Sequence, residues 1–304
     1  MSFEKYRGVI PAFYACYDDE GNVSPERTKA LARHLVNKGV QGLYVNGSSG
    51  ECIYLRPCER RTILEAVMEE VGGECTIIAH VACNNTADSM ALAAHAQSLK
   101  VDAVASIPPI YFHLPEDSIA KYWNDISSAA PDTDFVIYNI PQLAGVALTP
   151  SLFKKMLQNP RVIGVKNSSM PVQDIETFVR LGEGKIVVFN GPDEQFVSGR
   201  AIGACGGIGG TYSVMPELFL KMNELIGKGD IPAAARIQHE VNAIIEGLCA
   251  CKGNMYAVNK AVLRINEGLE LGGVRAPLAP LVPEDMPKVE AVAEKIRRAV
   301  KEFC

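Results

Sequence analysis

A lysine stands where a buried strand is expected to end. Lys166 closes the run VIGVK, whose other residues suit a strand that is buried on both faces. Burying an ammonium group is costly unless the group is paired or loses its proton, and the neutral amine attacks carbonyl carbons to form Schiff bases. Lowering a lysine pKa from about 10.4 to about 7 needs roughly 4–5 kcal/mol, which a desolvated site supplies. From position alone, a surface lysine at a strand end is an equal alternative.

Two other groups of residues suit chemistry beside an imine. Tyr138 lies in the apolar run FVIYNIP, where its phenol could transfer a proton; the alternative is a core tyrosine bonded to a backbone carbonyl. Gly47, Ser48 and Ser49 form a turn after another apolar run, and the N–H groups and hydroxyls of such a turn bind carboxylates or phosphates. We interpret His80, at the end of a third run, as a hydrogen-bonded buried histidine rather than a base or ligand.

The elements that must position these residues follow one rhythm, in which eight short apolar runs alternate with segments of helical periodicity. This alternation predicts an α/β fold, a parallel (β/α)8 TIM barrel, with its active site at the carboxyl ends of the strands. A doubly wound sheet is less suitable, because it does not need eight such units and no GxGxxG motif follows the first run. The expected strands begin near Gly8, Gly42, Cys75, Ala103, Asp134, Val162, Ile186 and Ala204, and the expected helices span Pro25–Lys38, Arg56–Val71, Thr86–Leu99, Glu116–Ala130, Pro150–Leu157, Val172–Leu181 and Asp193–Ile202.

The strand pattern stops near Pro216, and helix follows helix from there. We therefore expect residues 1–228 to form the catalytic barrel and residues 229–304 to form a C-terminal helical appendage packed on it.

Composition excludes several classes of protein. The 304 residues are 48% hydrophobic and 21% charged, and a net charge of −5 does not suit nucleic acid or an anionic membrane. No apolar stretch reaches the roughly 18 residues of a membrane span, so we expect a cytoplasmic protein. The nine cysteines include no CxxC pair and are expected to be mostly buried free thiols, and no spacing of His, Asp or Glu suggests a metal site.

Three spaced motifs carry a family resemblance. GSSGE at Gly47–Glu51, YNIP at Tyr138–Pro141 and GVKNSS around Lys166, followed by NGPDE and GGIGGTY, resemble the N-acetylneuraminate lyase and dihydrodipicolinate synthase family. The resemblance covers nearly the whole chain and implies a class I aldolase that uses pyruvate. Lys166 would form the imine with pyruvate, so that no metal or organic cofactor is needed.

The resemblance also implies roles for the other motif residues. Ser48 and Ser49, with the N–H groups of the turn that begins at Gly47, would hold the pyruvate carboxylate. Tyr138, aided by Ser49, would move the proton to or from the aldehyde oxygen. Tyr111 matches the tyrosine that completes the proton relay across a subunit interface, and the expected assembly is a homotetramer.

Other positions bear on which member of the family this chain resembles. Leu143 stands where dihydrodipicolinate synthases carry an arginine that binds a carboxylate of the second substrate. A leucine cannot pair with a carboxylate, so the dihydrodipicolinate synthase reaction is disfavoured. Asp193 and Glu194 match an acidic pair of the sialic acid lyases, and carboxylates suit sugar hydroxyls; the alternative is N-terminal capping of the next helix. Ser168 and Gly191 fall where those lyases contact the sugar chain. The expected reaction is reversible cleavage of sialic acid to N-acetylmannosamine and pyruvate, by a carbon–carbon lyase.

One position departs from the lyase pattern. Gly210 replaces a serine that touches the sugar, and one hydrogen bond is worth only about 1 kcal/mol. Another pyruvate-imine lyase or dehydratase therefore stays open, either dihydrodipicolinate synthase-like or acting on a 2-keto-3-deoxy sugar acid. An inactive barrel with a binding role is the third hypothesis, disfavoured by the intact Lys166 and Tyr138.

Overall fold

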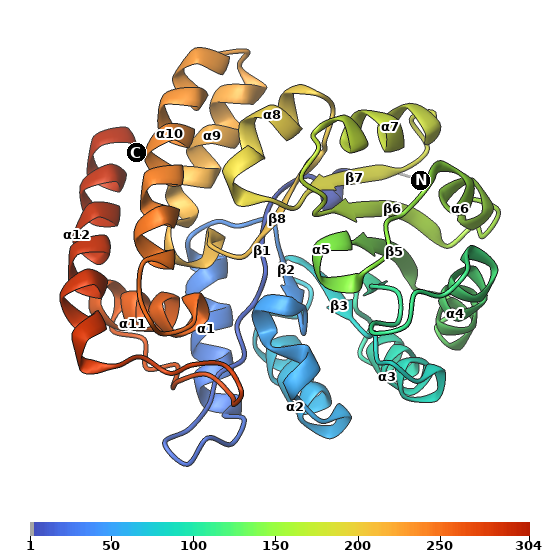
Figure 1. The fold of residues 1–304 in the computed structure, drawn as a ribbon, viewed down its shortest axis with the longest axis horizontal. Coiled ribbons are helices and arrows are strands. Elements are labelled where there is room, and N and C mark those ends of the chain that lie inside the picture. Colours follow the sequence, from blue (N-terminus) through green and yellow to red (C-terminus); the bar gives the residue numbers. More distant parts are fainter. Residues whose placement is uncertain (1–2) are drawn as a thin grey trace.

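The computed structural model describes residues 3–304, which form a ring of parallel strands enclosed by helices (Figure 1). The eight strands are hydrogen-bonded in the order β1-β8-β7-β6-β5-β4-β3-β2, and a parallel bridge between Ala12 and Tyr44 joins the two edges. The predicted TIM barrel is confirmed. The strands are β1 Gly8–Pro11, β2 Gly42–Val45, β3 Thr76–His80, β4 Ala103–Ser106, β5 Asp134–Asn139, β6 Val162–Asn167, β7 Val187–Asn190 and β8 Gly206–Gly209.

Several helices between the strands begin at a capping residue or a proline. Ser24, for example, accepts a hydrogen bond from the N–H of Arg27 at the start of α1, and a proline occupies the first turn. The first six expected helices are confirmed to within one residue at each end. In full, the helices that lie between β1 and β8 are α1 Pro25–Asn37, α2 Pro57–Val71, α3 Thr86–Ser98, α4 Glu116–Ala129, α5 Pro141–Ala144, α6 Pro150–Met156, α7 Gln173–Leu181 and α8 Phe196–Ala201.

The prediction of one continuous helix over Asp193–Ile202 was wrong at its start. A 3-10 turn, η4, covers Asp193–Gln195, and α8 begins only at Phe196. Asp193 is turned inward, where its carboxylate accepts hydrogen bonds from the loop after β8, so the first residues do not follow the helical path.

Two layers of apolar side chains form the core. One fills the barrel interior and includes Ile10, Ile78, Val136 and Phe189, and the other lies between the strands and the surrounding helices. Because successive residues of a strand point to opposite faces, Val165 joins the outer layer and Lys166 points inward. The strand period thus carries a lysine into the barrel.

The helices after β8 pack together on one side of the barrel, orange and red in Figure 1, and residues 229–304, which carry α10 to α12, are called the appendage below. Helix α10 packs against α8 and α9, and α12 packs against α10 and α11. The predicted division at residue 228 falls in the short segment between α9 and α10. These helices are α9 Pro216–Gly227, α10 Ile231–Cys249, α11 Met255–Glu267 and α12 Met286–Phe303.

All nine cysteines are free, as predicted, but the expectation that most are buried was wrong. Only Cys16 is fully buried, while Cys58, Cys249 and Cys304 are exposed because they lie on solvent-facing helix surfaces or at the chain end. Within residues 3–304, no helix is long and apolar enough to cross a membrane.

Candidate active site

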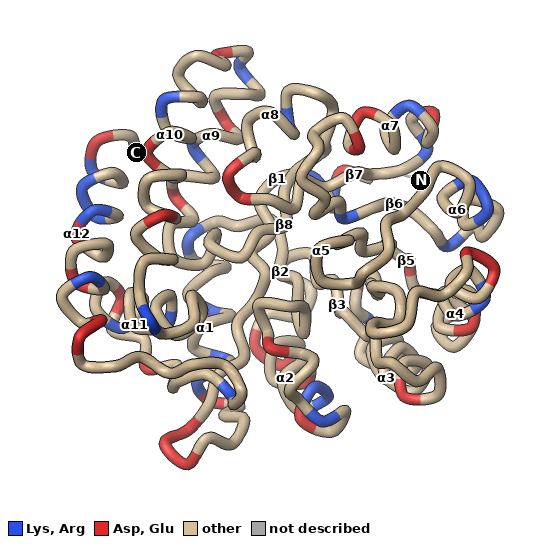
Figure 2. The backbone as a smooth tube through the Cα atoms, viewed as in Figure 1, with Lys and Arg blue, Asp and Glu red and all other residues tan. Residues whose placement is uncertain are grey.

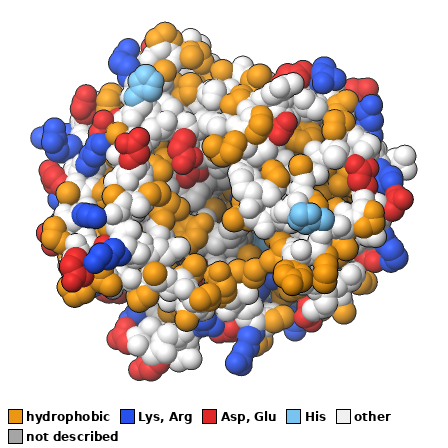
Figure 3. Space-filling view, viewed as in Figure 1, with side chains coloured by type: hydrophobic (Ala, Val, Ile, Leu, Met, Phe, Trp, Pro, Cys, Tyr) orange, Lys and Arg blue, Asp and Glu red, His pale blue; other side chains and the backbone are white. Residues whose placement is uncertain are grey.

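A pocket of about 320 Å³ opens at the carboxyl ends of the strands, and Figure 3 shows this face of the molecule hollowed at its centre. Its lining comes from strand ends and from α10 and α11 of the appendage. Of the residues predicted for the site, Ser48, Ser49, Tyr138, Lys166, Ser168, Gly191, Asp193, Glu194 and Gly210 line this pocket.

Lys166 lies on β6 at the bottom of the pocket and is only 3% exposed, so it is not a surface lysine. Its Nζ lies 3.8 Å from the ring centre of Tyr138 and 4.1 Å from that of Tyr44. No carboxylate within residues 3–304 forms a salt bridge with it. Burial lowers the pKa of Lys166 to about 7, against a weaker opposing effect of Asp193. A large fraction of the amine is therefore neutral at physiological pH.

Tyr138 is the neighbour of Lys166 in the β5–β6 register. Its Oη lies 3.5 Å from Ser48 Oγ and faces the pocket, which excludes the alternative of a core tyrosine bonded only to backbone. The rings of Tyr44 and His80 pack edge-on against it at 5.7 and 5.9 Å between centres. Burial raises the pKa of Tyr138 to about 12, so its phenol is protonated at neutral pH.

The turn after β2 places two hydroxyls beside these groups. A side chain on Gly47 would come within 2.6 Å of the Tyr44 ring, so the chain can enter the turn there only as glycine. Ser48–Gly50 then form a 3-10 turn, η2, whose first N–H groups have no partners inside the turn and are available to an anion. Ser49 is buried, and its Oγ lies 3.4 Å from Tyr256 Oη rather than beside Tyr138.

The acidic pair separates into two different environments. Asp193 is buried, and its carboxylate accepts hydrogen bonds from the N–H groups of Gly210 and Thr211 and from the Thr211 hydroxyl. Burial raises the pKa of Asp193 to about 6, and the bonds from Thr211 oppose that shift. Capping of the next helix is thus not what Asp193 does. Glu194 is exposed at the pocket rim, where its carboxylate is accessible to a bound ligand.

The remaining rim is uncharged. Gly191 packs so closely on Ser168 that a Cβ would lie 2.0 Å from the serine Oγ, which fixes these two residues side by side. Leu143 and Met170 extend over the opening with 64% and 56% of their surfaces exposed. Lys and Arg residues lie mainly on the outer helices (Figure 2). This pocket therefore offers little to a carboxylate on the second reactant.

Tyr111 is the one predicted catalytic residue that the chain does not bring to the pocket. It is 86% exposed, has a left-handed backbone with φ 87°, and packs edge-on against Phe112 at 4.9 Å between ring centres. It lines a separate surface depression beside α4.

Several pocket residues were missed in the sequence. Thr211, Met255 and Tyr256 line the pocket, and the ring of Tyr44 lies against Lys166. Tyr44 lies on β2, just before the serine turn, and its side chain points into the barrel. The alternation of side chains along this strand could have identified it. Nothing local marks Tyr256, because it comes from the appendage, 90 residues beyond Lys166 in the sequence.

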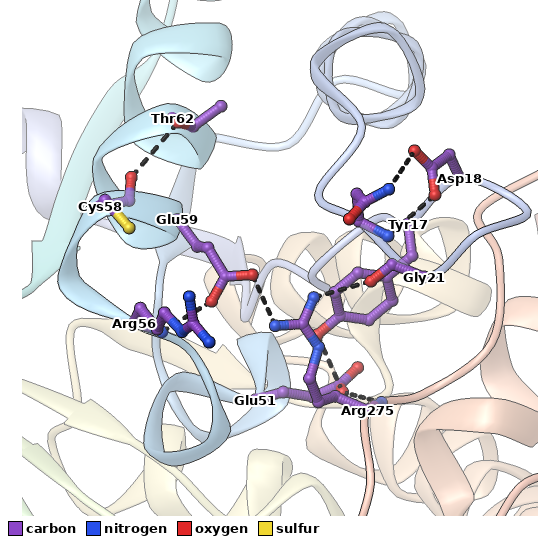
Figure 4. Close-up of polar contacts among 10 residues, drawn as sticks. Tyr17, Asp18, Gly21, Glu51, Arg56, Cys58, Glu59, Thr62 and Arg275 are labelled. Atoms are coloured by element: carbon purple, nitrogen blue, oxygen red, sulfur yellow. Dashed lines mark hydrogen bonds and ion pairs between the residues drawn. The ribbon is translucent and has the colours of Figure 1, made fainter.

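A buried ion pair fastens the serine turn to the appendage. Glu51, which ends the turn in a left-handed conformation with φ 56°, accepts a hydrogen bond from Lys260 Nζ at 2.8 Å. Both side chains have 1% or less of their surface exposed. Glu51 also accepts bonds from Tyr17 Oη and the N–H of Arg275, whose guanidinium continues to Glu59 (Figure 4). Helix α11 and the C-terminal loop are thereby held against the turn.

Known proteins resemble the chain along its full length. An N-acetylneuraminate lyase of Mediterraneibacter gnavus is 63% identical over 302 residues, covering 99% of this chain and 96% of the relative. The N-acetylneuraminate lyase of Salmonella agona is 33% identical and covers 95% of this chain and 97% of its own.

Solved structures agree in fold. A catalytic lysine mutant of Ruminococcus gnavus sialic acid aldolase superposes with a TM-score of 0.99 at 62% identity, covering 100% of this chain and 99% of that one. CdNal from Clostridium difficile, solved in complex with mannosamine, gives 0.91 at 28% identity over 95% and 99% of the two chains. The sequence model of the dihydrodipicolinate synthetase family matches residues 5–296. The chain is thus a member of the dihydrodipicolinate synthetase family.

Proposed function

We propose that this protein is a class I aldolase, a carbon–carbon lyase that cleaves N-acetylneuraminate reversibly to N-acetylmannosamine and pyruvate. The observation that carries the proposal is the buried amine of Lys166, lowered in pKa to about 7 and facing a pocket beside two tyrosines. A relative with the name N-acetylneuraminate lyase, 63% identical over nearly the whole chain, supports the choice of substrate.

The chemistry follows from the amine. Neutral Lys166 attacks the keto carbon of the open-chain sugar acid, and loss of water gives a protonated imine. The bond between the α and β carbons, counted from the imine carbon, then breaks. Its electron pair moves toward the imine, so that an enamine remains. Protonation of the enamine carbon and addition of water release pyruvate and regenerate the amine. The imine is the electron sink, so the reaction needs no metal or organic cofactor.

The proposal assigns the proton transfer of the bond-breaking step to Tyr138. The sugar hydroxyl must lose its proton as its carbon becomes the aldehyde. Tyr138 Oη receives that proton while passing its own to Ser48 Oγ, 3.5 Å away. The serine in turn releases its hydroxyl proton to the carboxylate that the turn holds, and the enamine carbon takes up that proton in the next step. The family resemblance assigned this assistance to Ser49; the proposal gives it to Ser48, whose hydroxyl is paired with Tyr138 while that of Ser49 is paired with Tyr256.

The substrate contacts divide between two ends of the pocket. The turn of Gly47, Ser48 and Ser49 holds the pyruvate carboxylate through its N–H groups and hydroxyls. Ser168, Gly191, Glu194 and Gly210 face the sugar chain, and Glu194 accepts hydrogen bonds from its hydroxyls. Asp193 supports that end by holding the β8 loop in place.

The proposed assembly is a homotetramer in which a partner copy brings Tyr111 to the proton relay. Its support is the exposure of Tyr111 and Phe112, at 86% and 70%, since large exposed aromatic side chains mark interfaces. The proposed location is the cytoplasm, because nine unpaired thiols suit a reducing compartment. Light scattering of the purified protein tests the assembly, and a monomer at micromolar concentration contradicts it.

The deciding experiment measures pyruvate release from N-acetylneuraminate, coupled to lactate dehydrogenase, with borohydride trapping of pyruvate in parallel. Release together with trapping is the expected result. Trapping without release contradicts the substrate and turns the search to 2-keto-3-deoxy sugar acids or a dehydratase reaction. Neither release nor trapping contradicts the aldolase mechanism and favours an inactive barrel.

A further inference from the structure

Two adjacent serines in the pocket are each paired with a tyrosine, and the two tyrosines come from opposite sides. Ser48 Oγ lies 3.5 Å from Oη of Tyr138, on β5 of the barrel. Ser49 Oγ lies 3.4 Å from Oη of Tyr256, on α11 of the appendage. Tyr138 has a role in the proposed reaction, whereas Tyr256 has none so far.

Gly210 provides the space in which the second pair meets. A Cβ at this position would lie 3.2 Å from Ser49 Oγ and 3.9 Å from Cε1 of Tyr256. The first distance is tighter than ordinary van der Waals contact, so even a methyl group would press on the serine hydroxyl. The glycine therefore does more than omit a hydroxyl: it leaves room for the serine and phenol to approach.

The same glycine is tied to the helix that carries Tyr256. Tyr14 Oη donates to the carbonyl of Gly210 at 2.5 Å and accepts from Asn259 Nδ2 at 3.0 Å. Asn259 lies on α11, and the Tyr14 and Tyr256 rings pack with their centres 6.1 Å apart. The loop after β8 and the first turn of α11 are thus fixed relative to each other.

We propose that Tyr256 is a positioning residue for Ser49, and that the lack of a side chain at Gly210 leaves the space in which the Tyr256 phenol and the Ser49 hydroxyl meet. The inference rests on the proposed function in one respect, namely that Ser49 binds the pyruvate carboxylate. In the structure the Ser49 hydroxyl donates to Tyr256 Oη. A carboxylate is a stronger acceptor than a phenol, so on binding pyruvate Ser49 donates to the carboxylate and accepts the phenolic proton of Tyr256 in a hydrogen bond.

Burial supports this direction of the bond. It raises the pKa of Tyr256 to about 12, so the phenol keeps its proton and can donate it at neutral pH. A serine hydroxyl rotates freely without a second partner, and the bond from Tyr256 holds its proton toward the substrate.

The first test is Tyr256→Phe, which keeps the ring against Tyr14 and removes only the hydroxyl. The readout is the pyruvate concentration that gives half-maximal borohydride trapping. We expect this concentration to rise about five-fold, the effect of one hydrogen bond, with trapping at saturation unchanged because Lys166 is untouched. Tyr6→Phe is the matched control, since Tyr6 is a buried, hydrogen-bonded phenol at the opposite end of the barrel. Its half-saturation is expected to equal that of the wild-type protein.

The second test is rescue by Gly210→Ser in the Tyr256→Phe background. A serine at 210 places a hydroxyl beside Ser49 from the same side, so we expect the double variant to return to within about two-fold of wild type. Gly210→Ser alone crowds Ser49 against an intact Tyr256 and is expected to weaken pyruvate binding. A merely structural tyrosine would lower thermal stability in Tyr256→Phe and would not be rescued in this way.

An unchanged half-saturation in Tyr256→Phe overturns the positioning role, and a double variant no better than Tyr256→Phe overturns the matching role of Gly210. If Tyr256→Phe does not fold, Gly210→Ala tests the same contact, with weaker pyruvate binding expected and unchanged binding contrary to the proposal. Trapping does not involve the sugar, so failure to cleave N-acetylneuraminate overturns the proposed substrate and leaves these measurements valid. A wild-type protein that traps no pyruvate overturns both.

Discussion

The pocket is built by two regions that hold their side chains in different ways. On the barrel side, Lys166 and Tyr138 stand on neighbouring strands and are fixed by the β5–β6 register. On the appendage side, Tyr256 depends on contacts that join segments far apart in the sequence, above all the Lys260–Glu51 ion pair across 209 residues.

This difference separates the residues proposed to carry out the reaction, which stand on strands, from those that shape the pocket around them. Strand pairing on both sides leaves little freedom to Lys166, which must keep a lowered pKa and a fixed approach to a carbonyl carbon. The appendage takes no part in that strand pairing. It supplies the partner of Ser49 and one wall of the pocket.

The largest expected effect comes from the barrel side. Lys166→Ala removes the nucleophile, and we expect pyruvate release to fall about 10⁴-fold or more and borohydride trapping to disappear. Lys185→Ala is the control and should behave as wild type, because Lys185 is an exposed lysine that pairs with nearby Glu183. Retained trapping in Lys166→Ala would assign the imine to another lysine.

The next effect tests the link between the two regions. Lys260→Met leaves the carboxylate of Glu51 buried without its charged partner, and the free energy of unfolding should fall by about 3–5 kcal/mol. Denaturant unfolding measures this change. Glu51→Gln combined with Lys260→Met removes both charges and should recover part of the loss. An equal stability for the single variant and the wild type would show that the pair does not fasten the appendage.

Tyr138→Phe distinguishes proton transfer from imine formation. We expect N-acetylneuraminate cleavage to fall about 100-fold, because the sugar hydroxyl loses its proton acceptor, while trapping with pyruvate persists. The coupled assay and the trapping assay are run on the same preparation. If cleavage and trapping fall together, Tyr138 serves the lysine rather than the aldehyde oxygen.

The smallest effect concerns pH. Only the neutral amine of Lys166 is a nucleophile, and its pKa is lowered to about 7, so the neutral fraction grows as pH rises through 7. Below pH 7, kcat/KM should fall about ten-fold per pH unit, and it should level off above about pH 8. A profile without a break between pH 6 and 8 would contradict the lowered pKa. Tyr256→Phe should leave this break in place, because it alters only the partner of Ser49.

Much of the fold could be predicted from the sequence because it rests on local periodicity. The six confirmed helix predictions follow from apolar spacing, caps and prolines, and the strands follow from short apolar runs between them. The Asp193–Ile202 helix was the exception, because Asp193 is turned inward by hydrogen bonds from the loop that follows β8.

The candidate site divides in the same way. The sequence by itself determined that Lys166 ends a buried strand, that Tyr138 stands on the strand before it, and that a glycine–serine turn follows another strand. These follow from strand period and from the rule that the ends of parallel strands meet on one face. Tertiary structure alone decided which hydroxyl faces which phenol, that Asp193 supports a loop, and that Tyr256 reaches the pocket from the appendage. Such pairings depend on packing between segments far apart in the chain, which no local pattern encodes.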